Sequence, residues 1–475
     1  MTDDLERLAG VCLFPGFPGL EPPAWITSWL HEGLGGVVLF SRNVESRDQL
    51  RSLTAALREA RGDVLIAIDE EGGDVTRLES ATGSSYPGNA ALGAVDDVDL
   101  TEQVAAAIAW DLVDVGVNLN LAPVADVNIN PANPVIGIRS FGSDGNLVAR
   151  HSAAFVRGTQ SAGVIACAKH FPGHGDTDVD SHLELPTVDS VSEDALLPFR
   201  AAIDAGVMSI MTAHIRVVSL GDEPATTSSR VLQRLLREEL GFTGMVMTDA
   251  LEMRAISATV GMAEGAVRAL QAGADALCFG HDVDEQACRC ISRAIADAVR
   301  AGRLLEGRVA EAAERVRLNG NWVVHSPRGE SVGSEVGLVA ARRAIRSDGA
   351  ASLSRTPLIV ELEVPPSIAA GESPGAGEWL RAALPGAELI RLDRDGSAEG
   401  LRLRGRQVVI VAHDVHRHPW QRAQIESLSA KVDDAIVVEV GLPHWRPPVA
   451  GRYLATYGAA RVNLEAAAAR LAEPS

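Results

Sequence analysis

The segment from Lys169 to His182, KHFPGHGDTDVDSH, holds the densest group of reactive side chains in the chain. Three histidines, one lysine and three aspartates stand there beside two glycines and one proline, which disfavour regular structure. The apolar run Val164–Ala168 leads directly into this segment. The pattern predicts a buried strand that ends in a polar loop, and such loops carry the functional groups of α/β enzymes.

Asp180 and His182 are two residues apart, so their side chains point the same way if the segment is extended. Asp180 could then orient His182, fix its tautomer and raise its basicity. Such a pair is a candidate general acid and base near neutral pH. Taken alone, the pair is equally compatible with a solvated loop that carries these charges by chance.

The same segment could instead ligate a metal ion. Asp176, Asp178 and Asp180 are spaced like the first ligands of a calcium-binding loop. Ser181 stands where that loop needs glycine, and Thr187 where it needs a carboxylate. Zinc sites favour cysteines or helical histidine spacing, which the segment lacks. We therefore expect no metal site here.

A second candidate is Asp249, which follows the apolar run Met245–Thr248. A strand would deliver this carboxylate to a loop with no lysine or arginine immediately beside it, which suits a nucleophile or a base. Aspartate is also a preferred N-cap of helices, and that role is the simpler interpretation of the residue by itself.

Two further segments combine glycines with charged side chains. The segment Ile68–Arg77, IDEEGGDVTR, places Asp69 after a strand and Arg77 after a tight turn, and could bind a polyol through carboxylate and guanidinium groups. It contains neither GxGxxG nor the lysine of a P-loop, which argues against a nucleotide. The segment Val135–Gly142 places Arg139 in a glycine-flanked loop.

The elements that would position these residues recur between residues 11 and 320. Short apolar runs alternate there with segments of helical periodicity. The runs are Val11–Phe14, Gly36–Phe40, Val64–Ile68, Val117–Leu121, Val164–Ala168, Met208–Thr212, Met245–Thr248 and Ala276–Phe279. Runs that are apolar on both faces are typical of parallel strands covered by helices, and eight of them predict a (β/α)8 TIM-type barrel. An open, doubly wound sheet is the alternative.

Charged residues follow five of these runs. They are Asp69, Asp126, Lys169 with His170, His214 and Asp249. The carboxyl ends of the strands form the active-site rim of a barrel. Five such positions at separate strand ends therefore favour the barrel over the open sheet.

A second α/β pattern follows a Gly-, Ser- and Arg-rich connection over residues 321–350. Its apolar runs are Leu358–Leu362, Leu389–Leu392, Val408–Ala412 and Ala435–Val440, before an alanine-rich helix near Leu464–Leu471. We predict a catalytic barrel domain over residues 1–325 and a smaller three-layer α/β sandwich domain over residues 326–475. The second region shows no dense polar cluster of its own, so we expect it to have a packing role, although one of its loops could reach the mouth of the barrel.

The composition restricts the partners and the compartment. The chain of 475 residues has 63 acidic and 43 basic side chains and a formal charge of −20, which opposes binding to nucleic acid or to an anionic membrane. No apolar run approaches the roughly 18 residues of a membrane span, and the acidic N-terminal residues are unlike a signal peptide. We expect a cytoplasmic protein with five free cysteines. The oligomeric state stays open.

The segments DEEGGDVTRL, LAPVADVNINPANPVIGIRSFGSD, KHFPGHGDTDVDSHLELP and GFTGMVMTDALEM resemble, in order and spacing, glycoside hydrolase family 3. Within it they are similar to the bacterial β-N-acetylglucosaminidase (β-N-acetylhexosaminidase) branch. The resemblance covers residues 10 to 320 densely and the C-terminal region more loosely. It implies a retaining exo-glycosidase that releases terminal N-acetylglucosamine from short cell-wall or chitin fragments, without a cofactor.

The resemblance also implies residue roles. Asp249 matches the nucleophile that forms a covalent glycosyl-enzyme, and the pair Asp180–His182 matches the acid/base dyad of this branch. Most other glycosidases use two carboxylates. The remaining matches are ligands of the innermost sugar: Asp69, Arg77, Arg139, Lys169 and His170.

The chain departs from the family pattern at Asp74, where arginine is common. An extra negative charge there would disfavour a substrate with an anionic lactyl-peptide and leaves chitobiose-type fragments open.

Three other functions remain. A phosphorylase of the same family would use phosphate, which histidine as acid/base repels less than a carboxylate does. A β-glucosidase is disfavoured because that branch usually lacks the Asp-Ser-His loop, and a non-catalytic sugar-binding protein would not need Asp249.

Overall fold

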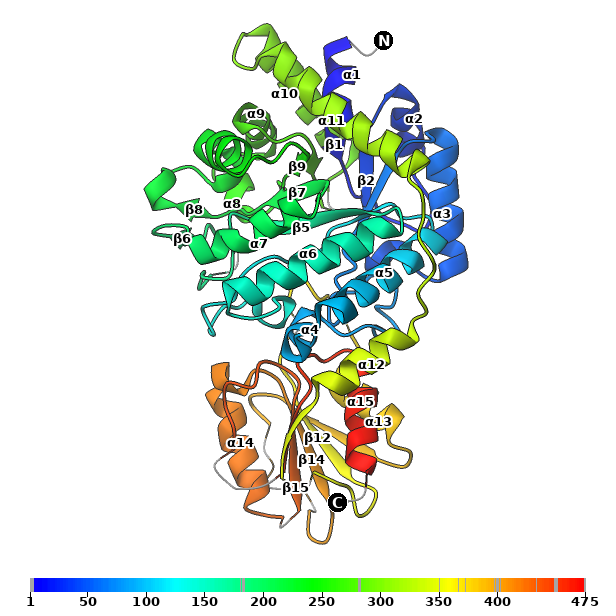
Figure 1. Ribbon diagram of the computed structural model, residues 1–475, viewed down its shortest axis with the longest axis vertical. Coiled ribbons are helices and arrows are strands. Elements are labelled where there is room, and N and C mark those ends of the chain that lie inside the picture. The colour runs from blue at the N-terminus through cyan, green and yellow to red at the C-terminus, as the bar shows by residue number, and fades with distance from the viewer. Residues whose placement is uncertain are drawn as a thin grey trace. The chain divides into compact units, whose positions relative to one another are not determined.

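The computed structural model describes residues 4–473 except 180, 182–183, 281–282, 350, 366, 372, 397, 399–400, 402, 433 and 448–451. The chain forms two compact units (Figure 1). The first contains Met1–Glu70, Thr101–Ile136 and Ser143–Val332, and the second contains Glu71–Leu100, Gly137–Gly142 and Gly333–Ser475. Two segments that precede the expected domain boundary at residue 325 therefore belong to the second unit.

Eight parallel strands of the first unit form a closed barrel. They are β1 (Leu13–Phe14), β2 (Gly36–Leu39), β3 (Leu65–Ile68), β4 (Leu119–Asn120), β5 (Ile165–Phe171), β7 (Ser209–Thr212), β9 (Met245–Met247) and β10 (Leu277–Cys278). Six of them pair in the order β2-β3-β4-β5-β7-β9, and β1 pairs with β10. Two contacts join these two sheets into a closed barrel. Met247, at the end of β9, forms a bridge with Ala276 beside β10, and Val38 N of β2 donates a 3.1 Å hydrogen bond to Pro15 O, just after β1. Each predicted run overlaps with one strand, which confirms the barrel.

Helices alternate with the strands of the barrel, and the first of them precedes β1. They are α1 (Asp4–Val11), α2 (Ala24–Glu32), α3 (Arg47–Ala60), α5 (Val98–Asp114), α6 (Gly145–Ser161), α7 (Glu193–Asp204), the π-helix η5 (Arg230–Glu239), α8 (Arg254–Ser257), α9 (Met262–Ala272), α10 (Glu285–Arg300) and α11 (Glu306–His325). Side chains cap several first turns: Ser46 accepts a hydrogen bond from Gln49 N, and Asp144 accepts one from Leu147 N.

Shorter elements lie in the loops of the first unit. They are η1 (Ser41–Asn43), η3 (Val218–Leu220), η4 (Ala225–Thr227) and the paired strands β6 (Thr187–Val188) and β8 (Arg216–Val217). None of the helices within the described ranges combines the length and apolar character needed to cross a membrane. All five cysteines are free, and only Cys290 is exposed.

The second unit contains a six-stranded sheet in the order β11-β16-β15-β14-β12-β13. The strands are β11 (Arg346–Asp348), β12 (Leu358–Leu362), β13 (Glu388–Leu392), β14 (Val408–Ala412), β15 (Ala435–Glu439) and β16 (Tyr453–Ala455). All pairs are parallel except the edge pair of β11 with β16. The helices are α4 (Asn89–Val95), η2 (Gly137–Arg139), α12 (Glu335–Ala344), α13 (Ala376–Ala383), η6 (Val415–Arg417), α14 (Pro419–Ser429) and α15 (Arg461–Ala472).

Two apolar layers sandwich this sheet. Alternate strand residues such as Ile359 and Val409 pack against α13 and α15 on one face. Their neighbours in sequence, such as Val360 and Ile410, pack with residues of α14 on the other face. This period-two alternation between two helix layers forms the three-layer α/β sandwich that the sequence predicts.

Candidate active site

Lys169 and Asp69 form a buried ion pair at the carboxyl end of the barrel. Asp69 directly follows β3, and Lys169 lies near the end of β5, with β4 between these two strands. Lys169 Nζ is 2.6 Å from Asp69 Oδ1, and only 2 % of the lysine side chain is exposed. The carboxylate compensates part of the cost of burying the ammonium group.

The strand that carries Lys169 continues further than the apolar run predicted. Its backbone extends to Phe171 because the neighbouring segments keep their hydrogen bonds to it: Lys169 N donates to Pro123 O over 3.0 Å, and Ala125 N donates to Lys169 O over 2.6 Å. The Lys169–His170 and Phe171–Pro172 peptide bonds are cis. Because of these backbone hydrogen bonds, Lys169 and His170 are held by the sheet itself rather than by the loop that follows.

His170 is oriented by Asp126, a fully buried aspartate. His170 Nδ1 is 2.7 Å from Asp126 Oδ2, and the backbone N–H groups of His170 and His174 donate to the same carboxylate over 3.3 and 2.6 Å. Burial opposes ionisation of Asp126, but the charge of His170 and these hydrogen bonds hold its pKa below the usual value. Since an ionised carboxylate only accepts, Nδ1 carries a proton, and Nε2 is the atom that can contact a ligand.

His174 stabilises the polar loop from within. Its Nδ1 lies 2.7 Å from Thr177 Oγ1, and its Nε2 lies 3.1 Å from Ser181 Oγ. Burial lowers the pKa of His174 to about 4, so the imidazole is neutral at physiological pH. Asp180 and His182, the predicted dyad, lie outside the described residues. Ser181 between them is buried, and its contact with His174 ties the loop to Asp126.

Asp249 follows β9, and its half-buried side chain accepts a 2.8 Å hydrogen bond from Ala250 N. The next helix, α8, begins at Arg254 with Met253 as its N-cap, so Asp249 does not cap it. His214 Nε2 donates to Ala250 O over 2.9 Å, and His214 Nδ1 lies 2.7 Å from Thr226 Oγ1. The buried histidine thus fixes the backbone beside Asp249, at the carboxyl end of β9.

Arg139 belongs to the second unit and forms a bidentate pair with Glu71. Arg139 Nε donates to Glu71 Oε2 over 2.9 Å, and a terminal nitrogen donates to Oε1 over 2.7 Å. Both side chains are at most 9 % exposed. The turn that carries Glu71 needs Gly73, which has a φ of +63° and whose Cβ would approach Gly88 to 2.7 Å.

Arg77 and Asp74 connect the same turn to the loops after the strands of the second sheet. Arg77 donates to Ala369 O over 2.9 Å, in the loop after β12. Asp74 Oδ1 accepts from Ala459 N over 2.9 Å, and its Oδ2 is 4.0 Å from His413 Nε2. Burial raises the pKa of Asp74. These contacts fix the positions of the Arg77 and Asp74 side chains within the second unit.

The second unit has a buried polar cluster, although its sequence shows no dense polar run. Glu439 accepts 2.8 Å hydrogen bonds from the N–H groups of Asp414 and Gly441. Asp414 Oδ1 accepts from Leu442 N over 2.8 Å, and Asp414 Oδ2 is 3.6 Å from His413 Nδ1. Burial, with help from Asp414, raises the pKa of Glu439 to about 7. These residues lie at the ends of β14 and β15. In the sequence, the only sign of the cluster is that the two apolar runs end in polar residues.

The described residues contain no group of three or more histidine, cysteine, aspartate or glutamate side chains arranged to hold a metal ion. Of the predicted site residues, the structure brings Asp69, Lys169 and His170 together at the carboxyl ends of β3 and β5. Asp126, His174 and His214 complete this rim, and the sequence had identified Asp126 and His214 only as strand-end residues.

Residues 22–318 match the model of the glycosyl hydrolase family 3 N terminal domain. The chain belongs to glycosyl hydrolase family 3. It is 40% identical over 269 residues to Beta-hexosaminidase A from Pseudoalteromonas piscicida, a match that covers 51% of this chain but only 45% of that relative. It is also 40% identical over 249 residues to a Beta-hexosaminidase from Vibrio cholerae, covering 52% of this chain and 74% of the relative.

A solved structure resembles the chain along its whole length. It is a glycoside hydrolase family 3 beta-N-acetylglucosaminidase from Paenibacillus sp., with a TM-score of 0.87 and 35% sequence identity. The match covers 99% of this chain and 97% of that one. Both the barrel and the three-layer second unit therefore recur together in a relative.

Proposed function

We propose that this protein is a retaining exo-β-N-acetylglucosaminidase that releases terminal N-acetylglucosamine from short cell-wall or chitin fragments. One observation carries the proposal: a family 3 barrel presents the buried pair Lys169–Asp69, the oriented His170 and Asp249 at the carboxyl ends of its strands. The names of the relatives at 40% identity, both beta-hexosaminidases, support the choice of sugar.

The nucleophile in this proposal is Asp249. Its carboxylate attacks the anomeric carbon while the bond to the leaving oxygen breaks, and a covalent glycosyl ester forms. Because its backbone is held by His214 through Ala250 O, the carboxylate can attack without reorganisation of the strand end. Hydrolysis of the ester returns the anomeric centre to its original configuration.

His182 acts as the acid and then as the base, with Asp180 as its partner. The imidazolium gives its proton to the leaving oxygen, and the imidazole later takes a proton from the water that attacks the glycosyl ester. An unperturbed imidazole titrates near pH 6.5, so it can serve both steps near neutral pH. The buried contact of Ser181 with His174 supports this role because it anchors the loop between the two residues.

Sugar recognition rests on paired donors and acceptors. The Lys169 ammonium group donates to sugar hydroxyls, the Asp69 carboxylate accepts from them, and His170 contributes Nε2 because Nδ1 is bound to Asp126. Arg77 and Arg139 are proposed as further sugar ligands from the family resemblance. Arg139 is held by Glu71, which leaves its geometry fixed.

The substrate includes muropeptide-type as well as chitobiose-type fragments. Asp74 was the argument against an anionic lactyl-peptide, but its carboxylate accepts a hydrogen bond from Ala459 N and lies near His413. Burial raises the pKa of this carboxyl group. The repulsion expected from this position is therefore weaker than the sequence suggests.

The test is release of nitrophenol from 4-nitrophenyl N-acetyl-β-D-glucosaminide, with and without phosphate and with the sugar product identified by mass. We expect free N-acetylglucosamine in both conditions, loss of turnover in Asp249→Asn, and normal turnover in Asp297→Asn, an exposed control carboxylate on α10. N-acetylglucosamine 1-phosphate as the product would instead identify a phosphorylase. No turnover with this sugar, together with turnover of another aryl glycoside, would overturn the sugar assignment.

A further inference from the structure

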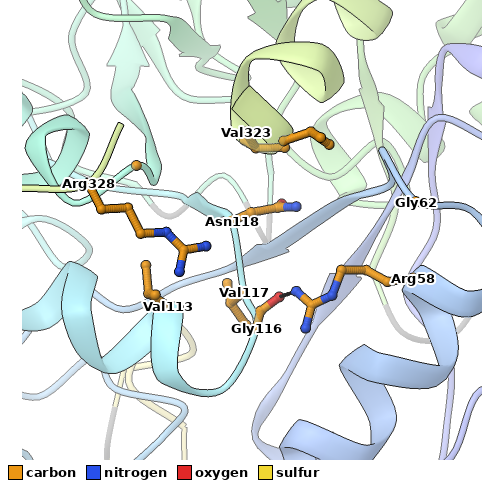
Figure 2. Close-up of a pocket in the computed structure, with 10 residues that line it drawn as sticks. Arg58, Gly62, Val113, Gly116, Val117, Asn118, Val323 and Arg328 are labelled. Atoms are coloured by element: carbon orange, nitrogen blue, oxygen red, sulfur yellow. Dashed lines mark hydrogen bonds between the residues drawn. The ribbon is translucent and has the colours of Figure 1, made fainter. Parts of the chain in front are cut away.

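A pocket of about 340 Å³ lies at the amino ends of the barrel strands (Figure 2). Gly62 precedes β3, Gly116 and Val117 precede β4, and Gly163 precedes β5. Asp69, Lys169 and Asp249 lie instead at the carboxyl ends of barrel strands. This pocket is therefore outside the candidate active site.

Arg58, near the end of α3, forms one wall of the pocket. One of its terminal nitrogens donates to Gly116 O over 2.6 Å, which fixes the guanidinium group beside the cavity. Gly116 has a φ of +80°, and a Cβ there would lie 2.1 Å from the other terminal nitrogen of Arg58. The close approach of this arginine thus requires glycine at position 116.

Arg328 forms the opposite wall, and the backbone that follows it is anchored twice. Gly329 N donates to Ser161 O at the end of α6 over 2.8 Å, and the Trp110 indole N–H of α5 donates to Glu330 O over 2.9 Å. Figure 2 shows the guanidinium groups of Arg328 and Arg58 both directed into the hollow. Two strongly basic groups from distant parts of the chain therefore converge on one cavity.

The described residues that line the pocket carry positive charge and no negative charge. The residues that line it include these two arginines and no aspartate or glutamate. Elsewhere in the same unit, by contrast, Arg308 and Arg237 each lie against Asp275. Burial and the neighbouring Arg328 lower the pKa of Arg58. The two like charges therefore oppose one another in a chain whose formal charge is −20.

Capping of helix ends explains only one of the two arginines. The helices α3, α5 and α6 end at this face, and their last carbonyls attract cations. Arg58 donates to Gly116 O just after α5, whereas no hydrogen-bond acceptor for Arg328 is found among the described residues. The amide of Asn118 is held by the backbone, since it accepts from Ile66 N and donates to Val64 O. The two guanidinium groups are thus the charged side chains of the lining that can meet an anionic ligand.

We propose that this pocket binds the phosphate group of a small anionic ligand between Arg58 and Arg328. Guanidinium groups match the oxygens of phosphate in pairs, and two of them balance the charge of a dianion. The valine side chains of the lining, Val113, Val117, Val323 and Val324, would contact an apolar part of the ligand. None of these residues belongs to the proposed glycosidase site, so phosphate binding here does not depend on that activity.

Isothermal titration of the full chain with inorganic phosphate and with phenyl phosphate, at constant ionic strength, tests the proposal. We expect both probes to bind, phenyl phosphate more tightly, and Arg328→Gln to weaken both at least tenfold. Arg300→Gln, an exposed arginine paired with Asp297 on α10, is the matched control and should bind as the wild type does. Arg328 is exposed, so its replacement should leave folding intact, whereas Arg58→Gln also removes the contact with Gly116 O.

Two results would overturn the proposal. The first is the absence of phosphate binding to the wild-type chain. The second is equal affinity in the wild type and Arg328→Gln, which would locate any bound phosphate elsewhere. If binding occurs as expected, a change of glycosidase rate on adding phosphate does not by itself indicate phosphorolysis, and only the identity of the sugar product does.

Discussion

Lys169 Nζ and Asp69 Oδ1 lie 2.6 Å apart across β4, although 100 residues separate them in the chain. The lysine side chain is 2 % exposed and the aspartate side chain 18 %. The pair is therefore asymmetric, because water can reach the carboxylate but hardly reaches the ammonium group.

This asymmetry predicts unequal costs of removing the two charges. Asp69→Asn takes away the charge that neutralises a buried ammonium group and should destabilise the fold by about 3 kcal/mol. Lys169→Met should cost less because Asp69 keeps access to water. Denaturant unfolding measures both. Both variants should lose activity on the aryl glycoside, and a larger stability loss in Lys169→Met than in Asp69→Asn would contradict the structure.

Asp126 should act on catalysis through His170. Asp126→Asn places an amide N–H₂ against N–H donors and removes the acceptor that fixes the His170 tautomer. We expect about 1–3 kcal/mol of lost stability and a fall in kcat/KM. Because the two residues act as a unit, the double variant Asp126→Asn with His170→Gln should be little worse in kcat/KM than His170→Gln alone. Fully additive losses would show that Asp126 acts independently.

His174 should make the fold less stable in acid. Its pKa of about 4 lies below the ordinary value of 6.5, so the unfolded state binds a proton first as the pH falls. The stability that neutral His174 contributes is complete above pH 6.5 and is lost as the pH falls toward 4, with an upper limit of about 3 kcal/mol. Thermal melts of the wild type and His174→Gln between about pH 7 and 4 measure the effect. Identical pH dependence in the two proteins would show that His174 does not cause it.

Glu439 should have the opposite effect in the second unit. Its pKa of about 7 lies above the ordinary value of 4.5, so the folded state keeps a proton that the unfolded state has lost. The contribution of Glu439 to stability is complete below pH 4.5 and decreases as the pH rises through 7, by up to about 3 kcal/mol. Glu439→Gln should flatten this decrease in unfolding experiments between about pH 5 and 8. An unchanged slope would contradict the raised pKa.

Most strands of the two units could be predicted from the sequence because their side chains are buried on both faces. The runs Val64–Ile68 and Val408–Ala412 are continuous and apolar, as buried parallel strands require. The strands β11 and β16 were missed because each has only three residues, and those of β11, Arg346–Asp348, are polar and exposed. No apolar pattern distinguishes so short an exposed strand from a loop.

The assignment of residues 71–100 to the second unit could not be predicted. The turn at Asp74 is held by Ala459, and Arg77 is held by Ala369, both more than 280 residues away in the chain. Local periodicity contains no information about such contacts. The rim residues Asp69, Lys169 and His170 could be predicted because each follows or ends an apolar run, and the barrel topology brings those ends together. The dyad Asp180–His182 stays a prediction.

Formation of a covalent glycosyl-enzyme on Asp249 is the central step of the proposed mechanism. The most direct test is to treat the protein with a 5-fluoro N-acetylglucosaminyl fluoride, because the fluorine substituent slows formation and hydrolysis of the intermediate while the good leaving group lets it accumulate. Intact mass and peptide mapping then locate the label. We predict one sugar per chain, on the peptide that contains Asp249, and none on Asp249→Asn. A label on another residue, or turnover of the aryl glycoside without any trapped ester and with inversion at the anomeric carbon, would contradict this mechanism.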